Sequence, residues 1–155
     1  MTDLTSLTTL LQEHERRRDD ALAEHQRAVD ASAAAAAQVE QLRGYRTEYE
    51  QRWSRQFQQA SPIALVQCYH SFMGRMSQAL EQQVHVVERA RVQVERAHGA
   101  LTAAELRCAS VRKLIERRAR EQLMASERRD QKLTDERATR AAWDRAQSGD
   151  AAPVN

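Results

Sequence analysis

The chain is poor in the side chains that fill a globular core. Of its 155 residues 41% are hydrophobic, but 26 residues are alanine and only 5% of the chain is aromatic. Small side chains therefore supply much of the apolar content, and bulky ones are scarce. This composition disfavours a compact domain and favours long helices, which need only a narrow apolar stripe.

Residues that interrupt helices are also scarce, with two prolines and four glycines in the whole chain. The only internal break lies at 60–62, where Ser61 suits a helix cap and Pro62 suits the first turn of a new helix. The sequence therefore predicts one elongated domain, 1–147, with helices at about 4–59 and about 62–147. We expect 148–155 to form a disordered tail.

The chain has two cysteines and no apolar run near 18 residues. Cys68 and Cys108 fall on the same predicted helix, about 60 Å apart at 1.5 Å per residue, so they cannot pair with each other. No signal segment with a charged and then an apolar region stands at the amino terminus. These features predict a reduced, cytoplasmic chain that does not span a membrane.

Apolar residues recur at alternating spacings of three and four along both predicted helices, a repeat typical of coiled coils. The first seam comprises Leu4, Leu7, Leu11, His14, Arg18, Ala21, His25, Ala28, Ser32, Ala35, Val39, Leu42, Arg46, Tyr49 and Trp53. The second seam comprises Val66, Tyr69, Met73, Met76, Leu80, Gln83, Val87, Ala90, Val94, Ala97, Leu101, Ala104, Cys108, Val111 and Ile115, broken only by Gln83.

A short connection favours antiparallel packing, with facing positions on the two helices adding to about 121. Leu4 then lies opposite Arg117, and the second seam ceases to be apolar at Arg118. The predicted fold class is therefore all-α: two long helices in an antiparallel coiled-coil hairpin, with a single-helix C-terminal overhang from about residue 118 to residue 145.

Catalytic and metal-binding patterns are absent from the sequence. None of the five histidines has the i, i+4 spacing of helical metal ligands, and there is no glycine-rich phosphate loop. A two-helix rod also offers no walled pocket for a nucleophile and its base. We therefore expect no metal, no cofactor, no small-molecule substrate and no enzymatic activity.

The basic excess lies late in the chain, with ten basic and six acidic residues in 112–140. A basic coiled-coil nucleic-acid-binding or scaffold protein is one interpretation. The interspersed acids weaken a phosphate-binding field, so a docking surface for a protein is the preferred one. Four apolar residues that a lone helix would expose support it: Leu123, Met124, Leu133 and Trp143.

Near the turn, one lateral stripe combines residues of both helices. It consists of Gln38, Leu42, Tyr45 and Tyr49 with their expected antiparallel counterparts Gln83, Ala79, Met76 and Phe72. The stripe is either part of the coiled-coil core or a partner-binding patch. Tyr45 and Phe72 lie off the two seams, which favours an outward-facing component.

Three segments resemble the flagellar FliJ family, the coiled-coil component of the bacterial flagellar type III export apparatus. They are QLRGYRTEY (41–49), the stretch from YHSF (69–72) to LEQQ (80–83), and the stretch from ERRDQK (127–132) to DERA (135–138). Their order and spacing carry the resemblance over nearly the full chain. The corresponding stalk proteins of virulence type III secretion systems are the alternative family.

The resemblance implies a non-enzymatic stalk or adaptor for flagellum biogenesis, and hence for motility and chemotaxis. In that family, the end bearing both termini inserts into the hexameric export ATPase, and a patch near the turn contacts the cytoplasmic domain of the export gate. The implied gate patch is the lateral stripe: Gln38, Leu42, Tyr45, Tyr49, Phe72, Met76, Ala79 and Gln83. The implied ATPase-facing tip is Leu7, Leu11, Arg128, Arg129, Lys132 and Leu133. The resemblance also implies escort of export chaperones and peripheral association with the inner membrane, and no nucleic-acid partner.

Overall fold

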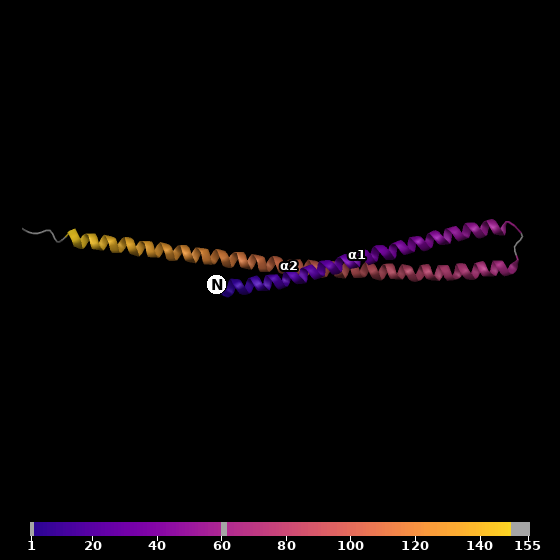
Figure 1. Cartoon of the computed structure of the whole chain (residues 1–155), viewed down its shortest axis with the longest axis horizontal. Coiled ribbons are helices and arrows are strands. Elements are labelled where there is room, and N and C mark those ends of the chain that lie inside the picture. The colour runs from indigo at the N-terminus through magenta and orange to yellow at the C-terminus, as the bar shows by residue number, and fades with distance from the viewer. Residues whose placement is uncertain (1, 60–61, 150–155) are drawn as a thin grey trace, which may run out of the picture. The chain divides into compact units, whose positions relative to one another are not determined.

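The computed structural model describes residues 2–59 and 62–149, which form two helices (Figure 1). Helix α1 spans Thr2–Phe57 and helix α2 spans Ile63–Gly149, with no strand among the described residues. These bounds lie within two residues of those expected from the sequence. Ser61, the predicted cap, and residues 150–155 of the predicted tail lie outside the described residues, whereas Ser148 and Gly149 belong to α2.

Helix α2 begins immediately after Pro62. The Pro62 carbonyl accepts hydrogen bonds from the backbone N–H groups of Leu65, at 3.0 Å, and Val66, at 3.4 Å. Pro62 therefore precedes the first turn, one position earlier than the sequence predicted. A missing N–H at this end of a helix removes no intrahelical hydrogen bond, because the first N–H groups have no partner within the helix.

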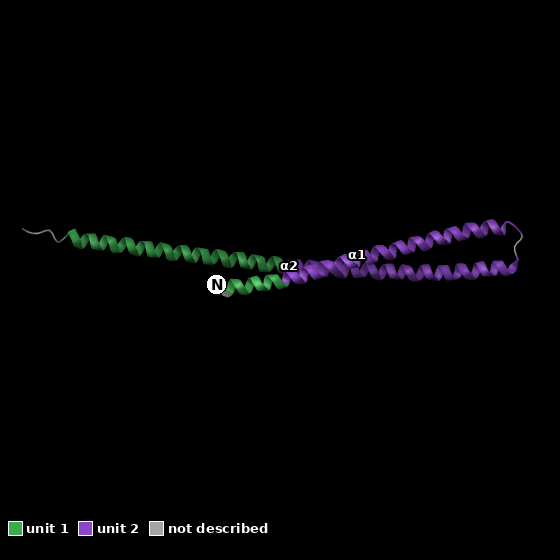
Figure 2. Ribbon diagram, viewed as in Figure 1, with its two compact units in different colours: residues 1–13, 108–155 green, residues 14–107 purple. Residues whose placement is uncertain are grey.

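The chain divides into two compact units, each built from part of both helices (Figure 2). Unit 1 combines 1–13 with 108–155, and unit 2 comprises 14–107. The hairpin that carries the lateral stripe lies wholly within unit 2.

In unit 2 the two helices pack against each other in antiparallel order. Gln38 contacts Gln83, and the rings of Tyr49 and Phe72 lie 5.0 Å apart. Nearer the turn, the Trp53 ring lies 5.3 Å from that of Tyr69. As residue numbers increase along α1, the numbers of their partners on α2 decrease. This is the register expected from the short connection.

Both predicted seams lie in the contact between the helices, because every residue of each seam is buried or half-buried. The fully buried apolar residues are Ala28, Ala35, Val39, Ala97, Leu101, Ala104, Cys108 and Val111. Cys108 is the most enclosed, with 1% of its surface exposed. The core is thin and made largely of small side chains, which lets two helices bury a continuous stripe without bulky residues.

In unit 1, the first turns of α1 meet α2 near residue 118. Asp3 Oδ2 lies 3.3 Å from Arg118 Nη1, and Leu4, Leu7 and Leu11 are half-buried. Beyond Ile115 every residue from 116 to 149 is exposed. Exposure begins where the second seam loses its apolar side chains. The single-helix overhang itself stays a prediction.

Candidate partner-binding surfaces

Tyr45 is the most outward-facing aromatic residue of the lateral stripe, with 45% of its surface exposed. Gln41, one turn earlier on α1, donates from Nε2 to the Tyr45 hydroxyl at 3.1 Å. The next stripe residue towards the amino terminus, Leu42, is half-buried. Tyr45 therefore presents a ring to solvent beside an apolar side chain that is already part of the helix contact.

Phe72 occupies a different environment from Tyr45, although both lie off the seams. It is half-buried, and its ring meets the ring of Tyr49 edge-on, with 66° between the planes. Edge-to-face aromatic pairs contribute about 0.5–1.5 kcal/mol beyond their buried area. Phe72 thus helps to hold the two helices together, and the stripe contains both an exposed residue and packing residues.

An aromatic cluster next to the turn includes a residue that the seam pattern missed. Phe57 lies 5.4 Å from Trp53 on its own helix and 5.4 Å from Tyr69 on α2. The sequence signal was the i, i+4 spacing of Trp53 and Phe57, which places both rings on one helical face. The cluster packs the two helices together beside the connection.

Gln83, the polar interruption of the second seam, has partners on the opposite helix. Its Nε2 donates to Gln38 Oε1 at 2.8 Å and to the Ala35 carbonyl at 3.4 Å. A half-buried amide without partners would be destabilising, and these hydrogen bonds remove that cost. Because they form in one alignment only, Gln83 favours the observed register over slipped ones.

A groove of about 590 Å³ runs beside the exposed part of the stripe. Three predicted residues line it: Leu42 from α1, and Ala79 and Gln83 from α2. Val86 and Arg89 line the same groove and were not predicted, although they follow Ala79 at seven and ten residues along the same side of α2. The groove combines apolar side chains with a cation, a combination suited to an amphipathic protein segment.

The residues of the predicted ATPase-facing tip all belong to unit 1 but form two separate groups. Leu7 and Leu11 are half-buried on α1, whereas Arg128, Arg129 and Lys132 are exposed on α2. Arg128 lies about 15 Å along the helix from Arg118, the residue that pairs with Asp3. The structure therefore does not bring Leu7 and Leu11 together with residues 128–133.

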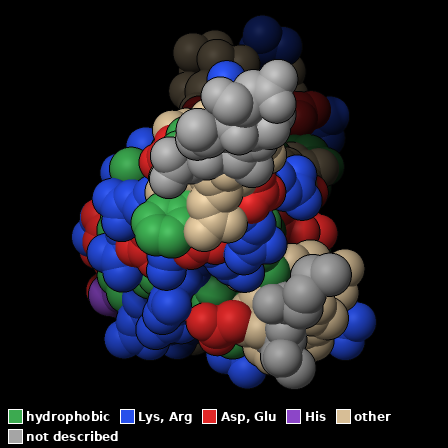
Figure 3. Space-filling model, turned by 90° about the vertical axis from the view of Figure 1, so that its left-hand side faces the viewer, with side chains coloured by type: hydrophobic (Ala, Val, Ile, Leu, Met, Phe, Trp, Pro, Cys, Tyr) green, Lys and Arg blue, Asp and Glu red, His purple; other side chains and the backbone are tan. Residues whose placement is uncertain are grey.

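The last part of α2 exposes large apolar side chains among charges of both signs. Leu133 is 50% exposed and Trp143 is 67% exposed. Trp143 borders a groove of about 470 Å³ that Lys132, Asp135, Glu136 and Arg140 also line. Figure 3 shows basic and acidic side chains interleaved over the visible face, with small apolar patches between them. The mixture suits a protein partner better than a polyanion.

Residues 2–59 and 62–149 contain neither a metal-binding cluster nor a membrane-spanning helix. Within 2–59 and 62–149, no group of three or more His, Cys, Asp or Glu side chains is placed to hold a metal ion. The ring centroids of His25 on α1 and His98 on α2 lie 5.6 Å apart, with 52° between the ring planes. Neither helix, over its described length, is long and apolar enough to cross a membrane.

Comparison with known proteins gives one family. The model of a family described as Flagellar FliJ protein matches residues 3–147. Neither the curated proteins nor the solved structures include a match to this chain. The matched range covers nearly all of α1 and α2, including the lateral stripe and the exposed part of α2.

Proposed function

The chain belongs to the flagellar FliJ family, and from this premise we propose that it is a non-enzymatic stalk or adaptor of the bacterial flagellar type III protein export apparatus. A helical component related to flagellar export is what the family implies. The finer proposal is that one chain contacts the export ATPase and the membrane export gate through different parts. Its support is that the chain has two exposed surfaces that belong to different units, one in unit 2 and one in unit 1.

We propose that the lateral stripe binds the cytoplasmic domain of the export gate. The observation that carries this proposal is Tyr45, an aromatic side chain 45% exposed and three residues along α1 from Leu42, which lines a groove with Ala79. Exposed aromatic residues beside apolar pockets are typical anchors of protein interfaces, because they bury large area at small entropic cost. Such a contact would hold the chain at the cytoplasmic side of the inner membrane.

We propose that unit 1 contacts the hexameric export ATPase. Support comes from the uninterrupted exposure of 116–149, where Arg128, Arg129 and Lys132 stand beside Leu133. Cations around an apolar side chain can pair with acidic loops of a ring, and the apolar side chain can then pack between those loops. Escort of export chaperones, and a role in motility and chemotaxis through flagellum assembly, follow from the same family and complete the proposal.

Replacing Tyr45 and Phe72 separately by alanine is expected to have different effects. Because Tyr45 is exposed, Tyr45→Ala should leave thermal unfolding nearly unchanged and weaken gate binding by about 1–3 kcal/mol. Because Phe72 packs on Tyr49, Phe72→Ala should also lower the free energy of unfolding, by about 1–3 kcal/mol for a half-buried ring. Circular dichroism melting and titration calorimetry with the gate's cytoplasmic domain measure the two effects.

Leu22→Ala is the matched control, since Leu22 is 52% exposed on α1 and lies outside the stripe. It should change neither quantity by more than about 0.5 kcal/mol. Wild-type affinity in folded Tyr45→Ala would contradict the gate assignment.

A further inference from the structure

The groove beside Leu42 continues along α2 into a second groove. The first groove, of about 590 Å³, includes Val86 and Arg89, and the second, of about 330 Å³, includes Arg89, Val92 and Arg96. Arg89 lines both, so the two grooves form one strip along this side of unit 2. Val86 and Val92 are half-buried, which gives the strip an apolar floor.

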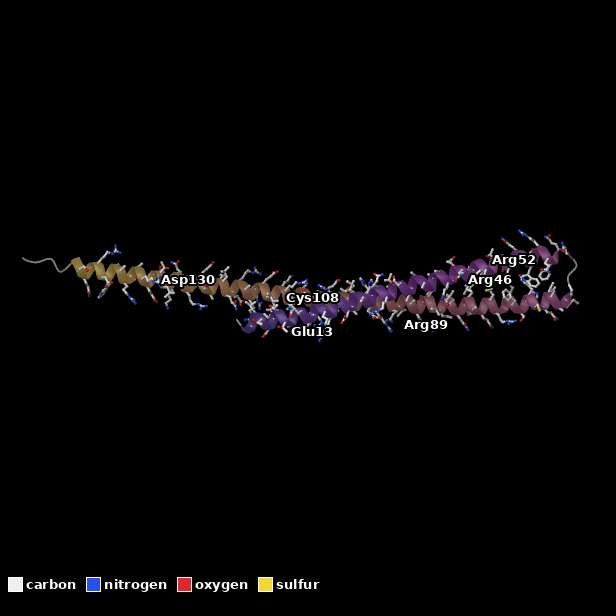
Figure 4. All side chains as sticks on the ribbon, viewed as in Figure 1. Glu13, Arg46, Arg52, Arg89, Cys108 and Asp130 are labelled. Atoms are coloured by element: carbon white, nitrogen blue, oxygen red, sulfur yellow. The ribbon has the colours of Figure 1, made fainter. Side chains whose placement is uncertain are left out.

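The two arginines of this strip differ from most arginines of unit 2. On α1, Arg46 pairs with Glu50 and Arg52 pairs with Glu48. Figure 4 labels these two arginines and Arg89. Arg89 and Arg96 have no hydrogen bond or ion pair with any residue in the described ranges. Their guanidinium groups are exposed and available to a partner.

Arg91, two residues from Arg89, provides a direct contrast. Arg91 Nη2 lies 2.7 Å from Glu88 Oε1, and Arg91 Nη1 lies 2.6 Å from Glu95 Oε1. The hydrogen bond and charge of Arg91 hold the pKa of the Glu88 carboxyl below its ordinary value. Glu88 also lines the second groove, but its carboxylate pairs with Arg91, as does that of Glu95. Arg89 and Arg96 therefore keep no carboxylate partner among the described residues.

The spacing of Arg89 and Arg96 indicates the kind of segment that they fit. They are seven residues apart, about 10.5 Å along α2. Carboxylates one heptad apart on a helix running alongside would meet both guanidinium groups, and an apolar residue between them would lie over the valines. Side chains in an extended strand repeat every two residues, which matches this helical spacing less well.

We propose that this strip binds an amphipathic helix of the export gate's cytoplasmic region, with Arg89 and Arg96 pairing with its carboxylates. The inference rests on the proposed gate contact and extends it from the stripe to two residues outside it. Leu42 and Tyr45 supply the apolar part of the interface. The arginines determine which segment binds and in which position along α2.

The test uses the full chain and the purified cytoplasmic domain of the export gate. The double variant Arg89→Gln/Arg96→Gln keeps helix-forming side chains and removes both charges. We expect its affinity to be about tenfold weaker than wild type, a loss of about 1.4 kcal/mol. The difference should shrink when NaCl is raised from about 0.05 M to about 0.5 M, because salt screens the ion pairs.

Arg55→Gln is the control, since Arg55 is an exposed arginine of unit 2 outside both grooves. It should bind like wild type at both salt concentrations. Wild-type affinity in the double variant, with Tyr45→Ala still weakened, would overturn the role of the arginines and leave the gate proposal standing. Absence of wild-type binding would overturn the gate proposal and this partner with it. A concentration-dependent dimer that the double variant abolishes would assign the strip to a second copy and contradict the proposal.

Discussion

A chain ending at Arg118 is expected to keep its helical hairpin and to lose all stimulation of the export ATPase. The removed part of α2 has no buried or half-buried residue, so its loss withdraws little packing energy. Arg118 remains to pair with Asp3. The basic residues proposed to contact the ATPase are removed completely, and the surface of unit 2 proposed to bind the gate is retained.

Steady-state ATP hydrolysis by the purified ATPase, measured with and without the truncated chain, gives the result. Gate binding by the same protein shows that unit 2 remains folded and functional. The triple variant Arg128→Glu/Arg129→Glu/Lys132→Glu in the full chain is the matched test of charge, and it should abolish most of the stimulation. Full stimulation by the chain that ends at Arg118 would show that the ATPase contacts lie elsewhere.

Leu101→Ala is expected to lower the free energy of unfolding by about 2–4 kcal/mol, the largest effect of any single leucine truncation that we predict. Leu101 is 8% exposed in a core whose other fully buried members in unit 2 are mostly alanines. Few neighbouring side chains are large enough to fill the space that the truncation leaves. The loss of buried apolar surface is therefore combined with an unfilled cavity.

Leu106, five residues further along α2, is the control for this substitution, because it is 63% exposed. Leu106→Ala should change the free energy of unfolding by less than about 0.5 kcal/mol, since alanine is also the stronger helix former. Urea unfolding followed by circular dichroism compares the two variants. Equal destabilisation by the two would contradict the assignment of Leu101 to the helix contact.

The heptad pattern predicted the contact between the helices well because its geometry follows from backbone periodicity. Once a short connection fixes the register, residues such as Leu101 and Val39 can face only the opposite helix. The register of Gln38 with Gln83 follows from the same rule. Helix α2 begins at Ile63, one residue later than the predicted start at about 62. Pro62 lacks only an N–H that would have no partner at this end of the helix, so the sequence alone does not distinguish the two starts.

The surfaces were less predictable because they depend on side-chain conformation as well as on helical position. Tyr45 and Phe72 are both aromatic residues that lie off the seams. Phe72 packs against the ring of Tyr49, whereas Tyr45 is 45% exposed. Arg89 and Arg91 are likewise two arginines, only two residues apart on α2, that the sequence does not distinguish. They differ because the acids at 88 and 95 lie within reach of Arg91.

We propose that one chain binds the export ATPase and the export gate at the same time, through different units. Sedimentation velocity of the full chain mixed with the ATPase hexamer and the gate's cytoplasmic domain tests it directly. Separate surfaces predict a single faster-sedimenting species that contains all three proteins, and Tyr45→Ala should release only the gate domain. Displacement of the ATPase by added gate domain would show that both partners use the same surface, and would contradict the account.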